Sequence, residues 1–424
     1  MKKHIFLSII IFLISLTLSM GDMFGLASIL VVFIVIILLA KRQPKVAVIL
    51  YTALALRLLT IYIGNNFFTL PDSAGDAYWF ELQAYEWSKE GFPKVLYTYP
   101  GWADSFFISY ILAILYSIAD RSVMLAQSLS LLFGTLSVLI IFRVAQKIWD
   151  TPTAIKIGWF AAFFPSMILY SALIMREVFV TFFLLIALNY VVDWTRTHNL
   201  KSFFLAILNF MIGTSWHGGI FVGLVIFLII AFTPFIKNVF KQFINGFISF
   251  TSLIGFMLIV ALLSIMSVND VRIPKIGIIT DFEVLKKEIL KKNLVTNRGE
   301  ARYPEWVVAK SESELIYKIP IKAIYLVFSP FPWDVKKASH LIGMFDGFMH
   351  LFLVYLIFRN RKAIWADPAL RIIFFILLAY LFAYGVGTGN FGTGIRHRTK
   401  FIFMFMLLAA PLLPKFILYK KMKK

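Results

Sequence analysis

Long apolar runs recur along almost the whole chain, and they limit its possible folds more than any other feature. Twelve runs approach the roughly 20 residues that an α-helix needs to cross the hydrocarbon core of a bilayer. They lie at about 4–20, 23–40, 47–63, 122–142, 155–174, 177–193, 201–216, 219–236, 244–266, 341–358, 369–387 and 399–418. Because a backbone in lipid must satisfy its own hydrogen bonds, each run predicts a helix.

The composition indicates the same fold class. Of the 424 residues, 60% are hydrophobic and only 15% are charged, whereas a soluble domain is about 45–50% apolar and about 25% charged. So few charged residues cannot cover a surface that faces water on all sides. We therefore expect an all-α, polytopic transmembrane bundle of about 12 spans that forms a single membrane domain over residues 1–424. The chain has no cysteine, which excludes disulfides and thiolate chemistry.

The first apolar run, 4–20, follows Lys2 and Lys3 and has some features of a signal peptide. However, the second run begins at Met23, which leaves almost no room for a mature N-terminus. We therefore expect the first run to be retained as a helix.

The basic residues indicate an orientation in the membrane. Cytoplasmic loops carry an excess of Lys and Arg, and alternation from a cytoplasmic N-terminus places every short basic loop inside. These loops contain Lys41, Arg42, Lys45, Arg143, Lys147, Arg196, Lys201, Lys237, Lys241, Arg359, Arg361, Lys362 and the four lysines of 420–424. The agreement requires the shorter apolar run 105–119 to lie in the outer interface. The net charge of +20 then indicates contact with anionic membrane lipids, and no nucleic-acid partner is expected.

Two long loops are expected on the outer face. The first, 64–121, contains the expected interfacial helix. The second, 267–340, is net basic and disagrees with the positive-inside rule, although that rule is weak for loops longer than about 60 residues. Almost all candidate polar groups lie in these loops or in the outer corners, so we expect any chemistry to face outward.

The first loop holds a pair of carboxylates, Asp72 and Asp76, among aromatic residues. On a helix, two residues four positions apart share a face. A carboxylate beside a low-dielectric boundary tends toward a raised pKa, which suits a general base. The alternative is that both are solvated loop acids, with Asp72 capping a helix behind Pro71.

Three further groups are candidates for substrate binding. Arg176 and Glu177 interrupt an apolar stretch, and charges at a membrane edge indicate function unless they only pair across a turn. Arg396, His397 and Arg398 precede the last apolar run, where guanidinium groups can hold a lipid phosphate or merely contact headgroups. His217, in the corner 215–219, is either a base or a capping group.

Motifs typical of metal sites and of P-loop nucleotide binding are absent from the sequence. The six histidines form no HExxH or HxH spacing, and no Walker sequence occurs. We therefore expect no metal and no cofactor.

The order of these features resembles the GT-C superfamily of integral-membrane glycosyltransferases, and family 39 in particular. The resemblance is carried by "DSAGDAYWFELQAYEW", "WADSFFISYILAILYSIADRS", "AQSLSLLFGTLSVLIIFRVAQKIW", "WFAAFFPSMILYSALIMREVFVTFFLLIAL" and "RHRTKFIFMFMLLAAP". It covers roughly 64–193 and the last helix, whereas the middle of the chain matches in hydropathy alone. Two spans, rather than the usual one, precede the helix that leads into the first loop, and the long C-terminal soluble domain of some members is missing.

The resemblance implies a function. It implies transfer of a sugar from a polyprenyl-(di)phosphate carrier to a glycan or glycolipid acceptor at the outer face of a bacterial inner membrane. The acidic residue of the first loop would be the base, and the "GDAYW" sequence favours Asp76 over Asp72. Arg396 and Arg398 would then hold the departing phosphate.

Besides a non-catalytic assembly partner, two alternatives remain open from the sequence. A Wzy-like polysaccharide polymerase shares the lipid-linked donor and the multiple spans. A lipid-linked oligosaccharide flippase would instead have polar groups along its spans and an internal repeat.

Overall fold

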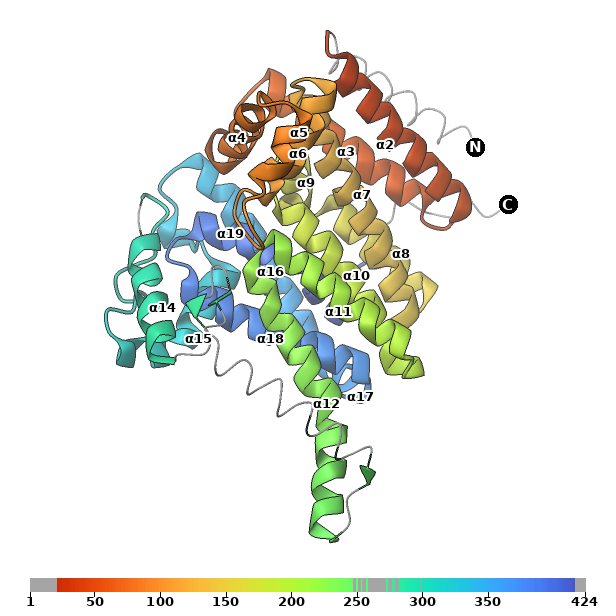
Figure 1. Cartoon of the computed structure of the whole chain (residues 1–424), viewed down its shortest axis with the longest axis vertical. Coiled ribbons are helices and arrows are strands. Elements are labelled where there is room, and N and C mark those ends of the chain that lie inside the picture. The colour runs from red at the N-terminus through yellow and green to blue at the C-terminus, as the bar shows by residue number, and fades with distance from the viewer. Residues whose placement is uncertain are drawn as a thin grey trace.

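The computed structural model describes residues 21–246, 282–297 and 299–415, together with a few positions between 249 and 278. The expected span 4–20 lies outside the described residues, as does most of the span expected at 244–266. The described chain is almost entirely helical (Figure 1). The strands β1 (Arg272–Ile273) and β2 (Gly277–Ile278) form one short antiparallel pair.

Seven described helices are long and apolar enough to cross a membrane. They are α2 (Met23–Arg42), α3 (Ala47–Asn66), α7 (Val123–Ile148), α10 (Glu177–Thr197), α12 (Phe221–Ile244, preceded by the 3₁₀ turn Gly218–Ile220), α16 (Ala338–Arg359) and α18 (Pro368–Gly387). The all-α fold, with several helices long and apolar enough to span a membrane, is thus confirmed for the described residues. A bent helix pair raises the number of spans to at most 8, so the expected count of about twelve is not confirmed.

Three expected spans take a different form. The run 155–174 is divided into α8 (Thr151–Phe163) and α9 (Pro165–Ala172), which are bent by 56°. Pro165 explains the break, because proline has no N–H to donate and its ring clashes with the preceding turn. The runs 201–216 and 399–418 form the shorter helices α11 (Leu200–Trp216) and α20 (Ile402–Ala409), the latter extended by the 3₁₀ turn Ala410–Leu412.

Helix α20 lies inside the bundle. Every residue from Ile402 to Ala409 is buried, as expected for a helix that is apolar on all sides. It packs against α16 and α18, and it directly follows α19 (Phe391–Thr399). The buried position of α20 therefore holds α19 against the bundle.

The short basic connections between helices gather at one end of the bundle. At this end Lys147 forms an ion pair of 2.7 Å with Asp193, and Arg196 pairs with Asp367. The indole nitrogen of Trp149 donates to a backbone carbonyl of α20. The opposite end, where α3 ends and α7 and α10 begin, is called the polar end below because it carries the polar groups of the site.

The segment 64–121 forms a small helical layer over the polar end. It contains a π-type turn (Ser73–Ala77), α4 (Tyr78–Ser88), α5 (Phe92–Val95), a 3₁₀ turn (Leu96–Thr98) and α6 (Phe107–Ala119). Helix α6 has 13 residues, or roughly 20 Å at 1.5 Å per residue, which is too short to cross a bilayer. It is tied to α4 by Tyr116 and Arg121, which both donate to Glu81.

The segment 267–340, expected as a long loop, contributes to the bundle itself. Its described part contains α14 (Phe282–Thr296), α15 (Glu312–Phe328) and the 3₁₀ turn Pro332–Asp334. Helix α15 packs against α16, α18 and α19. Its Lys322 is fully buried and donates to the backbone carbonyl of Thr388 at 2.8 Å, so one side of α15 belongs to the interior of the bundle rather than to a loop.

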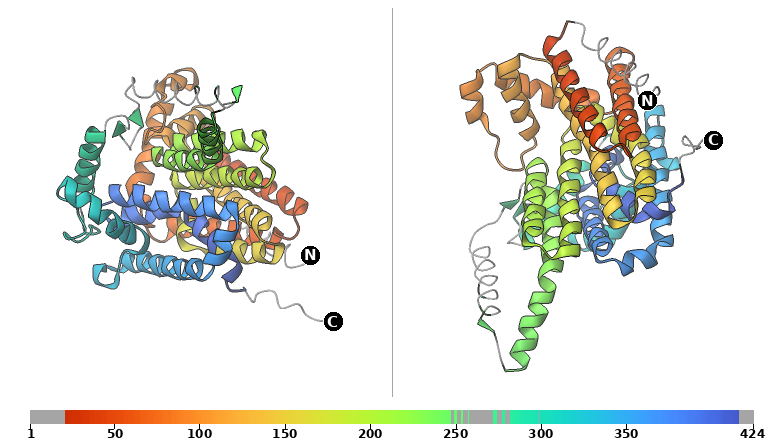
Figure 2. Two further views of the ribbon diagram at one scale, coloured as in Figure 1. Left: turned by 90° about the horizontal axis from the view of Figure 1, so that it is seen from below. Right: turned by 90° about the vertical axis from the view of Figure 1, so that its right-hand side faces the viewer.

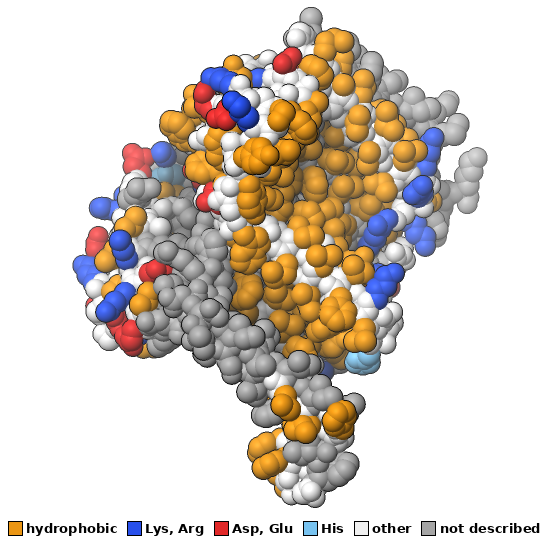
Figure 3. Space-filling view, viewed as in Figure 1, with side chains coloured by type: hydrophobic (Ala, Val, Ile, Leu, Met, Phe, Trp, Pro, Cys, Tyr) orange, Lys and Arg blue, Asp and Glu red, His pale blue; other side chains and the backbone are white. Residues whose placement is uncertain are grey.

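The surface of the bundle is apolar over wide areas. Large exposed hydrophobic side chains lie along α2, α11 and α12, including Ile34, Phe204 and Ile229. Figure 3 shows such side chains covering the middle of one face, with the charged side chains toward its edges. Helix α12 extends beyond its neighbours in Figure 1 and in the right-hand view of Figure 2. These faces suit contact with lipid tails.

Candidate functional site

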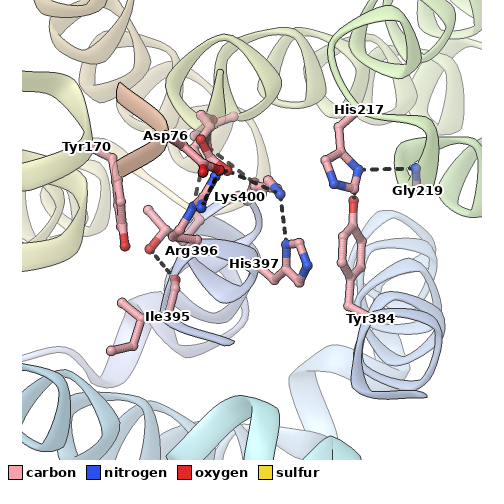
Figure 4. Close-up of polar contacts among 12 residues, drawn as sticks. Asp76, Tyr170, His217, Gly219, Tyr384, Ile395, Arg396, His397 and Lys400 are labelled. Atoms are coloured by element: carbon pink, nitrogen blue, oxygen red, sulfur yellow. Dashed lines mark hydrogen bonds and ion pairs between the residues drawn. The ribbon is translucent and has the colours of Figure 1, made fainter. Parts of the chain in front are cut away.

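Four segments far apart in the sequence bring polar side chains together at the polar end. They are the turn after α3, the α9–α10 corner, the α11–α12 corner and α19 (Figure 4). Apart from Arg398, all candidate residues named from the sequence lie in this cluster or at its edge. The cluster is bordered by the apolar core, so its charges interact through a medium of low dielectric constant.

Arg396 connects the first loop to the α9–α10 corner. Its guanidinium lies 2.7 Å from a carboxylate oxygen of Asp76 and 3.5 Å from one of Glu177. Asp76 is half-exposed, with 49% of its side chain accessible, whereas Glu177 is 1% accessible. The buried carboxylate of Glu177 anchors Arg396, and the exposed carboxylate of Asp76 is accessible to a molecule that approaches from the solvent.

Lys400 joins the same cluster from the next turn of the chain. Its fully buried ammonium lies 3.5 Å from Glu177 and 2.8 Å from the Nδ1 atom of His397. Helical residues four apart lie on one face, which is why Arg396 and Lys400 both reach Glu177. Glu177 therefore faces two cations from one side of α19.

Asp72 belongs to the site, but its backbone conformation and its contacts differ from those expected. Its φ of 66° is left-handed, and Gly75 breaks the helical path between Asp72 and Asp76. The two aspartates thus do not share one regular helix, and Asp72 makes no side-chain cap. The hydroxyl of Tyr170 donates to Asp72 at 2.8 Å. Burial raises the pKa of Asp72, although Arg396 and the Tyr170 hydrogen bond favour its carboxylate form.

Arg176 is buried under the first loop. Its side chain is 8% accessible, and its guanidinium carbon lies 5.7 Å from the centre of the Phe80 ring. Within the described residues, no hydrogen bond reaches its Nε or one of its Nη atoms. A guanidinium with unused donors beside the cluster is suited to binding an anion.

His217 and His397 lie on the side of the cluster away from Asp76 and Tyr170 (Figure 4). The Nδ1 atom of His217 accepts a hydrogen bond from the backbone N–H of Gly219 at 3.2 Å and lies 3.0 Å from the hydroxyl of Tyr384. The two imidazole rings are 5.5 Å apart between centroids. A Cβ atom at Gly219 would lie 2.6 Å from the Tyr384 hydroxyl, so a larger residue at this position would have to displace Tyr384.

Arg398 does not lie in the cluster, and the role of phosphate ligand expected for it is not supported. Its side chain is fully buried and pairs with Asp346 at 2.7 Å. It also donates to the backbone carbonyls of Val327, Ser329 and Gly343, so its donors are already in use. The physical reason is helical geometry: residues two apart are about 200° apart around a helix, so Arg398 points away from the side that carries Arg396.

Three residues of the site were not predicted from the sequence. Tyr170 and Tyr384 lie inside apolar runs, where nothing marks a tyrosine as a site residue. Lys400 was visible in the basic stretch, and its spacing of four from Arg396 was the signal that could have identified it.

Among the described residues, no group of three or more histidine, aspartate or glutamate side chains is arranged to hold a metal ion. Comparisons of the chain with protein-family models, with curated proteins and with solved structures found no match.

Proposed function

We propose that the protein is a membrane glycosyltransferase. It transfers a sugar or oligosaccharide from a polyprenyl-(di)phosphate carrier to a hydroxyl group of a glycan or glycolipid acceptor. The reaction occurs at the outer face of a bacterial inner membrane, in the assembly of surface polysaccharide or glycolipid, and both termini lie in the cytoplasm. The resemblance in the order of sequence features and the chemistry of the cluster support this proposal.

The contact between Asp76 and Arg396 is the main structural support for glycosyl transfer. Glycosyl transfer needs a proton acceptor for the attacking hydroxyl and a cation for the departing phosphate. Here a half-exposed carboxylate and a guanidinium lie 2.7 Å apart, at the edge of an apolar bundle. A lipid-linked donor can keep its chain along the apolar surface while its phosphate reaches Arg396.

The proposed reaction uses each charged group in turn. Asp76 accepts the proton of the acceptor hydroxyl, whose oxygen forms a bond to the anomeric carbon of the donor. The bond between that carbon and the phosphate oxygen breaks, and its electron pair stays on the phosphate. Arg396 binds this phosphate through its planar fork, and Arg176 adds its unused donors. Glu177 holds Arg396 and Lys400 in place.

Asp72 is the second candidate for the base. Its raised pKa suits a group that must take up a proton near neutral pH. Asp76 remains the first choice because it is more exposed to an incoming acceptor and carries the "DAYW" sequence of the resemblance.

The test is a transfer assay in proteoliposomes. The purified protein is supplied with a panel of polyprenyl monophosphate and diphosphate donors, radiolabelled in the sugar, and with glycan and glycolipid acceptors. We expect the wild-type protein to transfer label to an acceptor and release the carrier, and Arg396→Gln to lose this activity. Glu86→Gln is the matched control, because Glu86 pairs with Lys89 at the exposed surface. Failure to bind any carrier in native mass spectrometry would contradict the proposal.

The same assay separates the two alternatives. A polymerase would lengthen an oligosaccharide that stays on a diphosphate carrier. A flippase would move the intact lipid across the vesicle membrane and break no bond.

The proposed orientation is tested separately by reporter fusions. A reporter after Asp120 is expected outside the cytoplasm and one after Lys147 inside it. A cytoplasmic result at Asp120 would place α6 across the membrane and overturn the orientation.

A further inference from the structure

A short segment of the layer over the polar end exposes several large apolar side chains. Residues 92–99, called the aromatic tip below, comprise α5, the 3₁₀ turn that follows it and Tyr99. The accessible fractions are 43% for Phe92, 46% for Leu96, 89% for Tyr97 and 49% for Tyr99. Single exposed hydrophobic residues are ordinary, but a contiguous group of them marks a contact surface. The aromatic tip is therefore a candidate for such a surface.

The aromatic tip is packed against the rest of the layer. Val95 is fully buried within it. The ring of Tyr99 contacts the rings of Phe107 and Tyr110 in α6, at centroid distances of 6.3 and 5.5 Å. These contacts hold the aromatic tip on α6, so its exposed side chains belong to a packed element rather than to a detached loop.

The aromatic tip lies beside the end of an apolar helix face. The ring of Phe107 contacts the ring of Trp216, the last residue of α11, at a centroid distance of 4.9 Å. Helix α11 exposes Leu200, Phe204 and Leu208, which are spaced by four residues and therefore form one stripe. The right-hand view of Figure 2 shows the layer, in brown and orange, projecting sideways beyond the bundle. The aromatic tip thus continues, at the level where α11 ends, an apolar surface that suits lipid tails.

The chemistry of the aromatic tip matches the boundary between lipid tails and headgroups. Tyrosine is enriched at this boundary because its ring is apolar and its hydroxyl is polar, and the tip contributes Tyr97 and Tyr99. Lys94 is the only charged residue of the segment. Its ammonium can reach a lipid phosphate while its alkyl stem stays on apolar surface. Exposed apolar side chains with a single cation thus complement the surface of a bilayer.

We propose that the aromatic tip inserts into the lipid leaflet at the polar end of the bundle. Leu96 and Tyr97 lie among the upper parts of the lipid tails, and Lys94 faces the lipid phosphates. The insertion removes from water the apolar surface that the layer itself leaves exposed, which is favourable. This anchoring is independent of the reaction that the cluster performs.

The anchoring also supports the turn that carries Asp76. The aromatic tip packs on α6, and the hydroxyl of Ser109 in α6 donates to the backbone carbonyl of Phe80 at 2.7 Å. Phe80 lies in the first turn of α4, which begins directly after the turn that contains Asp76. A lipid contact at the aromatic tip is therefore linked to the site through two packed helices.

The test measures the depth of spin labels in lipid nanodiscs made of phosphatidylethanolamine and phosphatidylglycerol. Because the chain has no cysteine, Leu96→Cys and Tyr97→Cys each provide a single labelling site in the full-length protein. Electron paramagnetic resonance then compares collisions of the label with oxygen, which concentrates among lipid tails, and with a water-soluble nickel chelate. We expect both labels to show an oxygen-to-nickel ratio several-fold higher than that of a label in water.

Two further positions calibrate this ratio. Glu86→Cys in α4 is the water-exposed control from the same layer, because Glu86 is half-exposed and pairs with Lys89. Ile229→Cys is the lipid control, since Ile229 is 57% accessible on the apolar helix α12. A ratio at either tip position equal to that at position 86 would place the aromatic tip in water and overturn the proposal. Low accessibility to both reagents would mean that protein covers the aromatic tip, and would also overturn it.

Discussion

Replacing Asp76 by asparagine removes a proton acceptor while keeping almost the same shape. If Asp76 is the base, the variant should fold and bind the lipid-linked donor but turn over very slowly. The loss of a general base typically costs about 10²–10⁴ in rate, or about 3–5 kcal/mol in activation free energy.

The structure indicates that this loss would not come from unfolding. The ion pair of Asp76 with Arg396 involves a carboxylate that is 49% accessible, and exposed pairs contribute only about 0–1 kcal/mol to stability. Arg396 also keeps its contact with Glu177. The melting temperature in detergent should therefore change little, far less than the activity.

The assay is the release of carrier phosphate in proteoliposomes, measured for Asp76→Asn and Asp72→Asn beside the wild-type protein. Normal turnover in Asp76→Asn together with an inactive Asp72→Asn would move the base to Asp72. Near-normal turnover in both variants would refute the assignment of a base to this acidic pair, and with it the main reason to regard the protein as an enzyme.

Three other predictions concern neighbouring residues. Burial raises the pKa of Asp72, and the hydrogen bond from the Tyr170 hydroxyl partly opposes this shift. Tyr170→Phe should therefore raise the pKa of Asp72 further and move the acid limb of the pH–rate profile to higher pH. An unchanged profile would count against a role for Asp72. Arg396→Lys keeps the positive charge but loses the planar guanidinium, which can bind two phosphate oxygens at once. Titration of this variant with polyprenyl phosphate should show weaker binding than in the wild-type protein. Equal affinity would contradict phosphate binding by Arg396. Arg398→Met should lower the free energy of unfolding by about 3–5 kcal/mol, because the buried carboxylate of Asp346 loses its cation. An unchanged melting temperature would show that the ion pair of Arg398 with Asp346 does not stabilise the fold.

The helices were largely predictable because hydropathy is a local property. The expected runs 23–40 and 47–63 correspond to α2 and α3, with ends that differ by at most three residues. The bend at Pro165 was not expected, since 155–174 was read as one span, but it has a local cause, because a proline inside a helix removes a hydrogen bond. The long segment 267–340 was not predictable in this way. Helix α15 carries charged residues and a proline, and its place inside the bundle depends on α16, α18 and α19.

The sequence by itself determined that the chain forms helices long and apolar enough to span a membrane, and that its polar groups lie between them. Both properties follow from the residues of one short segment. It also named most of the residues that meet at the polar end. Only the tertiary structure decided which of them act together. Arg396 and Arg398 look equivalent in sequence, yet they point to opposite sides of α19. The contacts of α19 with Glu177 and with Asp346 decide which arginine reaches the site, and such long-range packing is not encoded in any single segment.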